Sequence, residues 1–404
     1  MSADRPASTE RLRRQNAALV LRSLRQLGPA TRAELAQRTA LAKATVGVIV
    51  AGLEEAGAVT ESSAESEVRS GARGRPGRPV ALRGEPWVGL GLELNVDYVA
   101  AVVLDLAGQV RLTETRPVAL DGGVDEAALA GLARDVTARC RAAGQVLVGA
   151  TVAVPALVRG DDRTVAWAPN LGVEGPGLAD GVEALVGAPV RVLNDANCAA
   201  YAESHHGAAV GAEHALYLTG TVGIGAGIVD RGELVRGAAG FAGEVGHMPI
   251  GDSSARCGCG RQGCWEASIG LHAVLAAVGM PELDTPLETA SAVAERAALD
   301  PGVRAVLTRV GEDVGLGLAM LAGVLDPEVV VLGGYFVPLG ELVLAPARAT
   351  LDRRLASAAQ VRPELRLSTL GIQAAALGAA EQAFADVFAG DLDLTAREAS
   401  AGEA

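Results

Sequence analysis

Apolar residues recur at helical spacing in three segments near the N-terminus. Residues 14–28 carry leucines at near-helical spacing and end at a glycine. Residues 31–34 read T-x-x-E, a capping-box pattern that predicts the start of a second, short helix. Residues 43–57 repeat apolar side chains at i, i+3, i+4 and i+7, which predicts a third amphipathic helix. A strand-like segment follows, and this order is that of a winged helix-turn-helix, whose third helix enters the major groove of DNA.

The segment after the third helix, residues 61–79, is rich in Gly, Ser, Arg and Pro. We interpret it as the wing and its extension, with a plain linker as the alternative. Its G-R-P-G-R-P stretch places Arg75 and Arg78 on a chain that prolines hold extended, slim enough for a narrow minor groove.

Candidate DNA contacts within the helices are few. Lys43 and Thr45 are the polar residues near the start of the third helix, and Arg32 begins the second. Ala42 occupies the position where an N-cap Ser or Thr is preferred. Specificity would therefore rest on a few base contacts, with basic side chains binding phosphates.

The rest of the chain alternates apolar strands with helices, which predicts an α/β fold. A meander of three β-runs covers residues 86–118, and further apolar strands are expected near 145–158, 188–194, 214–230 and 327–336. The meander-then-helix order occurs twice, near 88–118 and near 214–250, as expected for two similar lobes that face a cleft.

Length and charge divide the 404 residues into parts. Residues 1–85 hold 14 basic against 9 acidic residues, whereas the remainder holds 21 against 39. A basic head on an acidic body suits a polyanionic partner, although a chance fluctuation gives the same counts. We predict a DNA-binding domain over 1–85, an α/β domain over 86–388 and an unstructured tail over 389–404.

The chain shows neither a signal peptide nor a run of about 20 apolar residues, so we expect a cytoplasmic protein without a membrane partner. Aromatic residues make up 3% of the chain, which disfavours a stacking surface for single-stranded nucleic acid.

Three of the five cysteines lie within CGCGRQGC: Cys257, Cys259 and Cys264. His247 precedes them, and a Cys₃His set fills a tetrahedral zinc site without an open position, which indicates a structural Zn²⁺. A disulfide is disfavoured in a cytoplasm, and a redox C-x-x-C is absent. The two remaining cysteines are expected to be buried as small apolar residues.

Polar residues flank the same loops. Glu244 lies three residues before His247, and Glu266 lies two after the last cysteine. Asn194 and Asp195 end an apolar strand, where α/β proteins bind ligands. Paired carboxylates accept hydrogen bonds from vicinal hydroxyls, as polyol recognition requires, although each residue alone could be a solvated turn residue.

Together these motifs resemble the ROK family of repressors and sugar kinases. The resemblance runs from about residue 12 to 385 and rests on G-F-A-G-E-V-G-H, on C-G-C-G-R-Q-G-C-W-E and on N-D-A-N. It implies a two-lobed, actin-like fold in which Asn194, Asp195, Glu244, His247 and Glu266 contact a sugar. His247 could then use one ring nitrogen for zinc and the other for a hydroxyl.

Two functions fit that resemblance. In the kinases of the family, Asp195 would be the catalytic base, and two turns would position the phosphates of ATP. The second turn is present, with Gly220, Gly223 and Gly225, but at the first D-x-G-G-T is replaced by E-L-N-V-D at 93–97. Losing both glycines disfavours phosphate binding, so Asp195 would be vestigial and catalytic residues are not expected.

We therefore expect a sugar-responsive transcriptional repressor that binds operator DNA as a homo-dimer or tetramer. Its effector would be a sugar or a sugar phosphate. The alternative is an active ATP-dependent sugar kinase that carries a DNA-binding head. A zinc hydrolase needs an open metal position, which Cys₃His does not leave.

Overall fold

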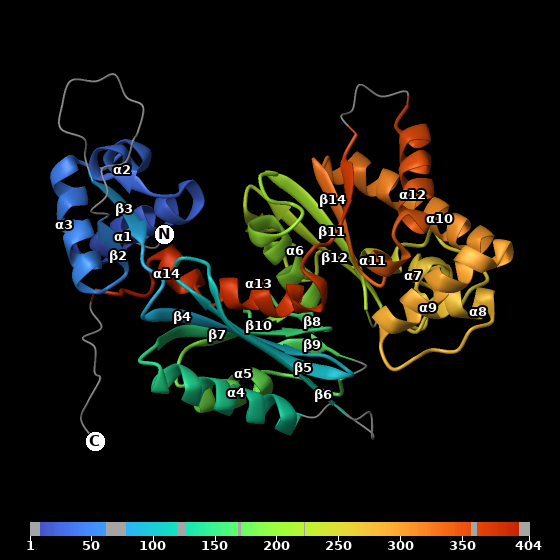
Figure 1. The fold of residues 1–404 in the computed structure, drawn as a ribbon, viewed down its shortest axis with the longest axis horizontal. Coiled ribbons are helices and arrows are strands. Elements are labelled where there is room, and N and C mark those ends of the chain that lie inside the picture. The colour runs from blue at the N-terminus through green and yellow to red at the C-terminus, as the bar shows by residue number, and fades with distance from the viewer. Residues whose placement is uncertain are drawn as a thin grey trace, which may run out of the picture.

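The N-terminal part folds into a small head of helices and short strands (Figure 1). Residues 9–61, 78–118, 126–168, 171–221, 223–356 and 362–395 are described by the structure, a computed structural model. The head comprises α1 (Thr9–Leu27), β1 (Ala30–Thr31), α2 (Arg32–Thr39), α3 (Lys43–Glu55), β2 (Val59–Glu61) and β3 (Pro79–Leu82). The three helices predicted from the sequence are confirmed. Strand β3 lies between β1 and β2 and pairs antiparallel with both.

Local sequence explains where the head's helices begin and which faces they bury. The capping box is present at α2, where the Thr31 hydroxyl accepts the N–H of Glu34 and the Glu34 carboxylate accepts the N–H of Thr31. Helix α3 starts after Ala42 without a side-chain cap and buries the predicted stripe at 46, 49, 50 and 53. The prediction that the leucines of α1 form its buried face is partly wrong, because Leu27 is 61% exposed and Val20 is buried instead.

The body contains two five-stranded sheets of the same design. The first is β10 (Val190–Asn194), β7 (Val146–Val154), β4 (Trp87–Leu94), β5 (Tyr98–Asp105) and β6 (Val110–Pro117), in that order. The second is β13 (Glu233–Leu234), β12 (Ile224–Asp230), β11 (His214–Gly220), β14 (Val329–Gly334) and β15 (Glu364–Leu367). Each sheet joins an antiparallel meander to two parallel strands. The expectation of two similar lobes is thus confirmed, with β15 as a strand that the sequence did not indicate.

Helices cover these sheets and fill the lobes (Figure 1). The first lobe carries α4 (Glu126–Ala142), α5 (Gly177–Val186) and a small hairpin of β8 (Leu157–Val158) and β9 (Val165–Trp167). The second lobe carries α7 (Glu266–Ile269), α8 (Leu271–Val278), α9 (Pro286–Leu299), α10 (Pro301–Leu325), α11 (Phe336–Leu339) and α12 (Glu341–Arg354). Helices α6 (Asp195–His206) and α13 (Ala374–Gln382) pack against each other between the sheets. Short 3₁₀ turns occur at η1 (Val245–His247) and η2 (Gly371–Gln373).

Glycines in strand β4 allow α13 to lie directly on the first sheet. A Cβ at Gly91 would lie 1.9 Å from the carbonyl oxygen of Ala376, and one at Gly89 would lie 2.7 Å from that of Ala380. No side chain fits at such distances, so the strand needs glycine at both positions. The C-terminal part of the chain therefore returns to the first lobe and closes it.

The last described residues complete the core of the head. Helix α14 (Ala385–Ala389) lies against α1, and Leu394 is 2% exposed within the apolar cluster that holds Val20 and Val50. Arg22 also donates to the carbonyl of Phe388 at 2.8 Å. The prediction of an unstructured tail is therefore wrong for 389–395, because its leucines have an apolar surface to cover. Residues 396–404 lie outside the described part.

A buried carboxylate joins the head to the body. Glu381 of α13 accepts hydrogen bonds from Arg25 of α1, at 3.1 Å from Nε, and its Oε2 lies 3.1 Å from His206 Nε2 at the end of α6. Burial alone would raise the pKa of Glu381, but the hydrogen bond from His206 and the charge of Arg25 outweigh it and lower the pKa to about 2. One charged residue therefore contacts both the head and helix α6.

Candidate functional site

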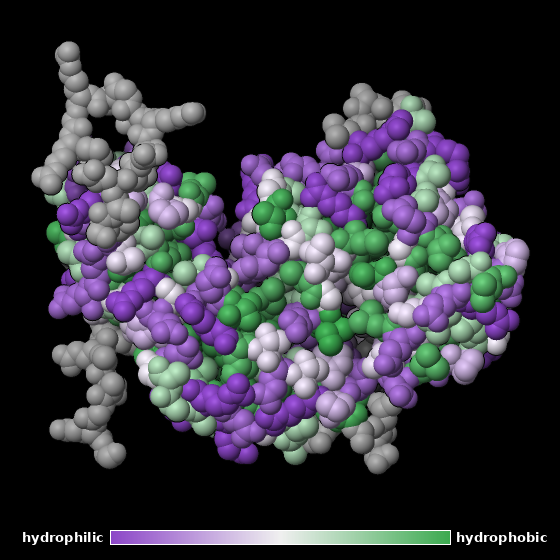
Figure 2. All heavy atoms as spheres, in the orientation of Figure 1, coloured by the Kyte–Doolittle hydropathy of each residue, from purple (hydrophilic) through white to green (hydrophobic). Residues whose placement is uncertain are grey.

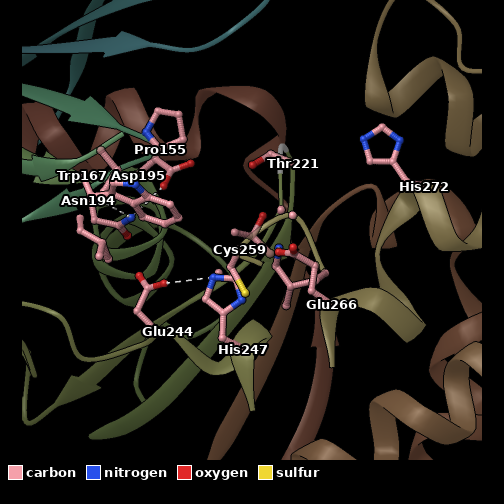
Figure 3. Close-up of a pocket in the computed structure, with 17 residues that line it drawn as sticks. Pro155, Trp167, Asn194, Asp195, Thr221, Glu244, His247, Cys259, Glu266 and His272 are labelled. Atoms are coloured by element: carbon pink, nitrogen blue, oxygen red, sulfur yellow. Dashed lines mark hydrogen bonds and ion pairs between the residues drawn. The ribbon is translucent and has the colours of Figure 1, made fainter. Parts of the chain in front are cut away.

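A cavity of about 370 Å³ opens between the lobes and brings together the predicted sugar contacts. Asn194, Asp195, Glu244, His247 and Glu266 all line it, and Figure 3 shows them around one space. They come from segments up to 72 positions apart, so the fold produces this grouping. A space of this size suits a small ligand.

Helix α6 presents two of these residues at its N-terminus. Asn194 is the N-cap, and its side chain accepts the N–H of Asn197 at 3.1 Å and donates to the carbonyl of Ala156 at 3.2 Å. Asp195, the first helical residue, is 8% exposed. Burial, together with the nearby charge of Glu244, outweighs the backbone hydrogen bonds that lower the pKa of Asp195 and raises it to about 7. The carboxyl of Asp195 can thus carry a proton near neutral pH.

Glu266 anchors the glycine-rich turn between β11 and β12. Its Oε2 accepts the N–H of Ile224 at 2.8 Å, and its Oε1 lies 3.4 Å from the thiol of Cys257. A Cβ at Gly223 would lie 2.5 Å from Glu266 Oε2. Glycine at 223 is therefore needed to bring this carboxylate against the turn.

Glu244 lies just before η1 and His247 lies within it, beside Glu266 in Figure 3. His247 Nε2 is 4.0 Å from Glu244 Oε2, the contact drawn as a dashed line in Figure 3, and His247 Nδ1 faces Cys257 Sγ at 3.8 Å. Burial raises the pKa of Glu244, which His247 partly offsets. The two ring nitrogens thus face two different groups, and the expected contacts of His247 with zinc and a hydroxyl remain predictions.

His247, Cys257, Cys259 and Cys264 form a cluster that could hold a metal ion, with their ligand atoms all within 4.8 Å of one another. Arg261 donates to Cys259 Sγ at 3.4 Å. Burial would raise the pKa of Cys259, but hydrogen bonds from the backbone and side chain of Arg261 and from the other thiols lower it to about 6. A ready thiolate among three sulfurs and one imidazole is a donor set that suits a soft or borderline metal. Cys140 and Cys198 are buried apart from this cluster, as predicted.

Side chains fill the turn between β4 and β5, where the sequence reads E-L-N-V-D. Asn95 accepts the N–H of Val96 at 2.8 Å and donates to Glu93 at 3.3 Å, while the Tyr98 hydroxyl donates to Glu93 at 2.6 Å. Burial raises the pKa of Glu93 to about 8, more than the hydrogen bond from Tyr98 lowers it. Asp97 is nearby, and burial raises its pKa too. The polar side chains of this turn thus form hydrogen bonds with one another and with its backbone.

The glycines expected in a phosphate turn have other packing partners. A Cβ at Gly220 would lie 2.0 Å from the ring of Tyr335, and one at Gly225 would lie 3.1 Å from the Cβ of Ala196. Gly220 thus has a steric reason to be glycine without any nucleotide, and Gly223 and Gly225 lie close to Glu266 and Ala196. Their role as a vestigial phosphate turn remains a prediction.

Sequence reasoning missed Trp167, which lies on the same cavity. It ends β9, is 41% exposed, and lies beside Asn194 and Asp195 in Figure 3. The other two tryptophans, Trp87 and Trp265, are buried. An exposed aromatic face offers flat apolar surface to the C–H face of a sugar ring. The sequence contains three tryptophans, and this small number was the only signal that could have drawn attention to Trp167.

The predicted DNA-contacting residues differ in exposure, and one of them, Arg32, already forms ion pairs within the head. Lys43 and Arg78 are exposed, and Thr45 is half-buried on the first turn of α3. Arg32 forms ion pairs with Glu61 at 2.6 Å and Glu54 at 3.5 Å, so its charge is partly neutralised. Arg75, like most of the predicted wing, lies outside the described residues.

The duplicated sheets, the cleft between them and the Cys/His loop define a two-lobed sugar-kinase-like architecture. The sequence profile of the ROK family matches residues 89–385, and the chain belongs to the ROK family. It is 28% identical to the xylose repressor of Bacillus subtilis over 91% of this chain and 94% of the repressor. It is 31% identical to the glucokinase of Streptomyces coelicolor, over 73% of this chain and 98% of the kinase.

The solved structures support the same fold, with the head included. A ROK family transcriptional regulator, described as a homologue of the E. coli MLC protein, superposes with a TM-score of 0.76 at 24% identity, over 94% of this chain and 98% of that one. In the part of the chain that the structure describes, helices long and apolar enough to cross a membrane are absent.

Proposed function

We propose that this chain is a sugar-responsive DNA-binding transcriptional repressor whose kinase-like body serves as the sensor. The observation that carries the proposal is the pairing of a complete sugar cavity with a filled turn at 93–97. The first is lined by every predicted sugar contact, whereas in the second Asn95 accepts the N–H of Val96 and Tyr98 donates to Glu93, in place of the glycine backbone that phosphates need. The repressor relatives align along more than nine-tenths of this chain, head included, while the glucokinase covers about three-quarters.

The metal that we propose for the Cys/His cluster is Zn²⁺ in a structural role. Three sulfurs and one nitrogen satisfy four-coordinate zinc and leave no position for water. The metal would fix the loop that bears Glu244 relative to the helix that bears Glu266. Its contribution is therefore to hold two sugar contacts in place, and it takes no part in a reaction.

We propose that α3 is the DNA-reading helix. It lies on the outer side of the head in Figure 1, and Ala44, Val48 and Ala51 on it are exposed, Val48 by 63%. Such small apolar side chains contact thymine methyls, while Lys43 at the helix start contacts a phosphate. Because few base contacts are available, two heads of a homo-dimer or tetramer would together supply specificity through half-site spacing.

Helix α6 is the physical connection that we propose between sensor and head. Its first turn carries Asn194 and Asp195 at the cavity, and its last residue, His206, contacts Glu381, which in turn contacts Arg25 of α1. A sugar that binds one arrangement of the lobes better than the other would shift the position of α6 and hence of the head. Arg25→Ala should therefore weaken the sugar response while sugar binding itself persists.

The test begins with DNA selected from a random duplex library by the purified protein. Binding to the selected duplex is followed by fluorescence anisotropy while D-xylose, D-glucose or their phosphates are added. Glu244→Ala should bind DNA normally and lose the response to the active sugar. Glu233→Ala, an exposed acid on β13 of the same lobe, should retain that response.

Three results would contradict the proposal. They are a failure to select any duplex, DNA binding that is indifferent to salt concentration, and phosphorylation of a sugar by ATP that Asp195→Asn abolishes. A Glu244→Ala protein that still responds to sugar would show that the cavity is misassigned.

A further inference from the structure

A second, larger cavity adjoins the sugar cavity on the side of the filled turn. It encloses about 610 Å³, within the range of sites for small molecules. Its walls are mainly apolar and come from both lobes: Val96, Leu283, Pro286, Leu287, Val337 and Ile372. In Figure 2 hydrophobic residues gather where the two lobes meet.

The ionisable carboxyl groups on this cavity outnumber its one imidazole. Glu93, Asp97, Asp195, Glu282 and Asp284 line it, and none of the described residues lining it is a lysine or an arginine. The one basic side chain, His272, is already 3.6 Å from Glu282. A negatively charged ligand would therefore meet carboxyl groups without a compensating cation.

This arrangement is the reverse of what a nucleotide needs. Phosphates are bound by glycine-rich turns with free N–H groups, but the N–H of Val96 already donates to the side chain of Asn95. The apolar volume remains, however, because Asn95 and Val96 fill only the turn.

We propose that this cavity is a second ligand site, which takes an uncharged small molecule with a flat, ring-sized apolar body. The apolar walls supply the binding free energy through burial, and the carboxyl groups offer hydrogen-bond acceptors to ligand hydroxyl or amine groups. Asp97, Glu282 and Asp284, the less buried of these acids, disfavour phosphorylated and other anionic molecules.

The two cavities share four lining residues, Asp195, Thr219, Thr221 and His272, so their occupants would be neighbours. A ligand in the second cavity contacts both lobes, and it would therefore favour one of their arrangements. By linkage, it and the sugar would change each other's affinity by the same factor.

The test uses two fluorescent probes that share one apolar framework and differ in charge. N-phenyl-1-naphthylamine is neutral, and 8-anilino-1-naphthalenesulfonate carries a sulfonate. Titration of the full-length protein should show saturable binding of the neutral probe at one site and at least about tenfold weaker binding of the sulfonate, a difference of about 1.4 kcal/mol or more. Neither DNA nor sugar is used, so failure here would leave the repressor proposal intact.

Three variants locate the probe. Ile372→Asp places a charge on a wall residue that is 44% exposed, and it should weaken binding of the neutral probe about tenfold. Val324→Asp changes an apolar residue of α10 that is 81% exposed outside both cavities, and it should have no effect. Asp97→Lys should strengthen binding of the sulfonate about tenfold.

The proposal is overturned if both probes bind equally well to the wild-type protein, or if the neutral probe does not bind at all. It is also overturned if Val324→Asp weakens the neutral probe as much as Ile372→Asp does, since the dye would then lie on the outer surface. Unchanged binding of the sulfonate to Asp97→Lys would show that the acidic lining does not control selectivity.

Discussion

The two lobes contain the same hairpin, yet the turns at the ends of these hairpins have opposite properties. Between β11 and β12 the turn consists mainly of small residues, and a carboxylate from α7 accepts its Ile224 N–H. Between β4 and β5 the turn is closed by Asn95, Glu93 and Tyr98, which bond to one another. A common strand pattern therefore does not decide whether a turn is open to a ligand. The side chains of a few turn residues decide it.

The largest effect is expected at the open turn, from Glu266→Ala. This change removes the acceptor of the Ile224 N–H and one of the proposed sugar contacts, each a hydrogen bond to a charged group worth about 1.5–3 kcal/mol. Sugar affinity should fall about 100-fold or more, as measured by isothermal titration. Asp252→Ala is the matched control, because this exposed acid lies in the loop before α7 and its carboxylate accepts from Ser254 of that loop. A loss of less than about threefold would mean that Glu266 holds the turn but not the sugar.

The next largest effect is expected at the closed turn, from Glu93→Gln. This change should remove a pH dependence of the free energy of unfolding that the wild-type protein shows. The pKa of Glu93 is about 8 in the folded protein and 4.5 when exposed. Between these values the unfolded chain has lost the proton that the folded chain keeps, so stability falls as pH rises. Relative to the variant, the wild type should lose about 2 kcal/mol from pH 5.5 to 7 in urea unfolding, at about 1.4 kcal/mol per unit. Parallel stability curves for the two proteins would show that Glu93 ionises normally.

A smaller effect is expected from Tyr98→Phe, which deletes one hydroxyl from the closed turn. The Tyr98 hydroxyl donates to Glu93 at 2.6 Å and accepts from Asn95 at 3.2 Å. Its loss should cost about 1 kcal/mol of the free energy of unfolding and leave sugar affinity unchanged. If sugar affinity changed as well, the two turns would not be independent, and the contrast between them would have to be given up.

Much of the fold follows from short-range patterns in the sequence. The capping box at Thr31 and the stripe of α3 depend on residues three or four apart, and both are present. The Cys₃His set was recognisable because its ligands lie within 18 positions. Local spacing and residue chemistry were sufficient for these features, and the motifs that contain Asn194 and Glu244 supply residues that line one cavity.

Features that depend on distant partners could not be predicted in this way. The pairing of Arg25 with Glu381 spans 356 positions, and neither residue has a local pattern that indicates the other. Arg32 looked like a free cation because Glu61 is far along the chain. Trp167 has no local pattern that places it on the cavity, where the fold brings it. In each case tertiary contacts determined the environment of the side chain.

The contribution of the C-terminal segment to the head has a consequence for synthesis. Leu394 emerges from the ribosome after both lobes, whereas its packing partners Val20 and Val50 are made before them. The apolar cluster around α1 and α3 thus stays incomplete until both lobes have been made. Chains that stop early would carry a sensor with an unfinished head, so a nascent or truncated product would not compete for the operator with the finished protein.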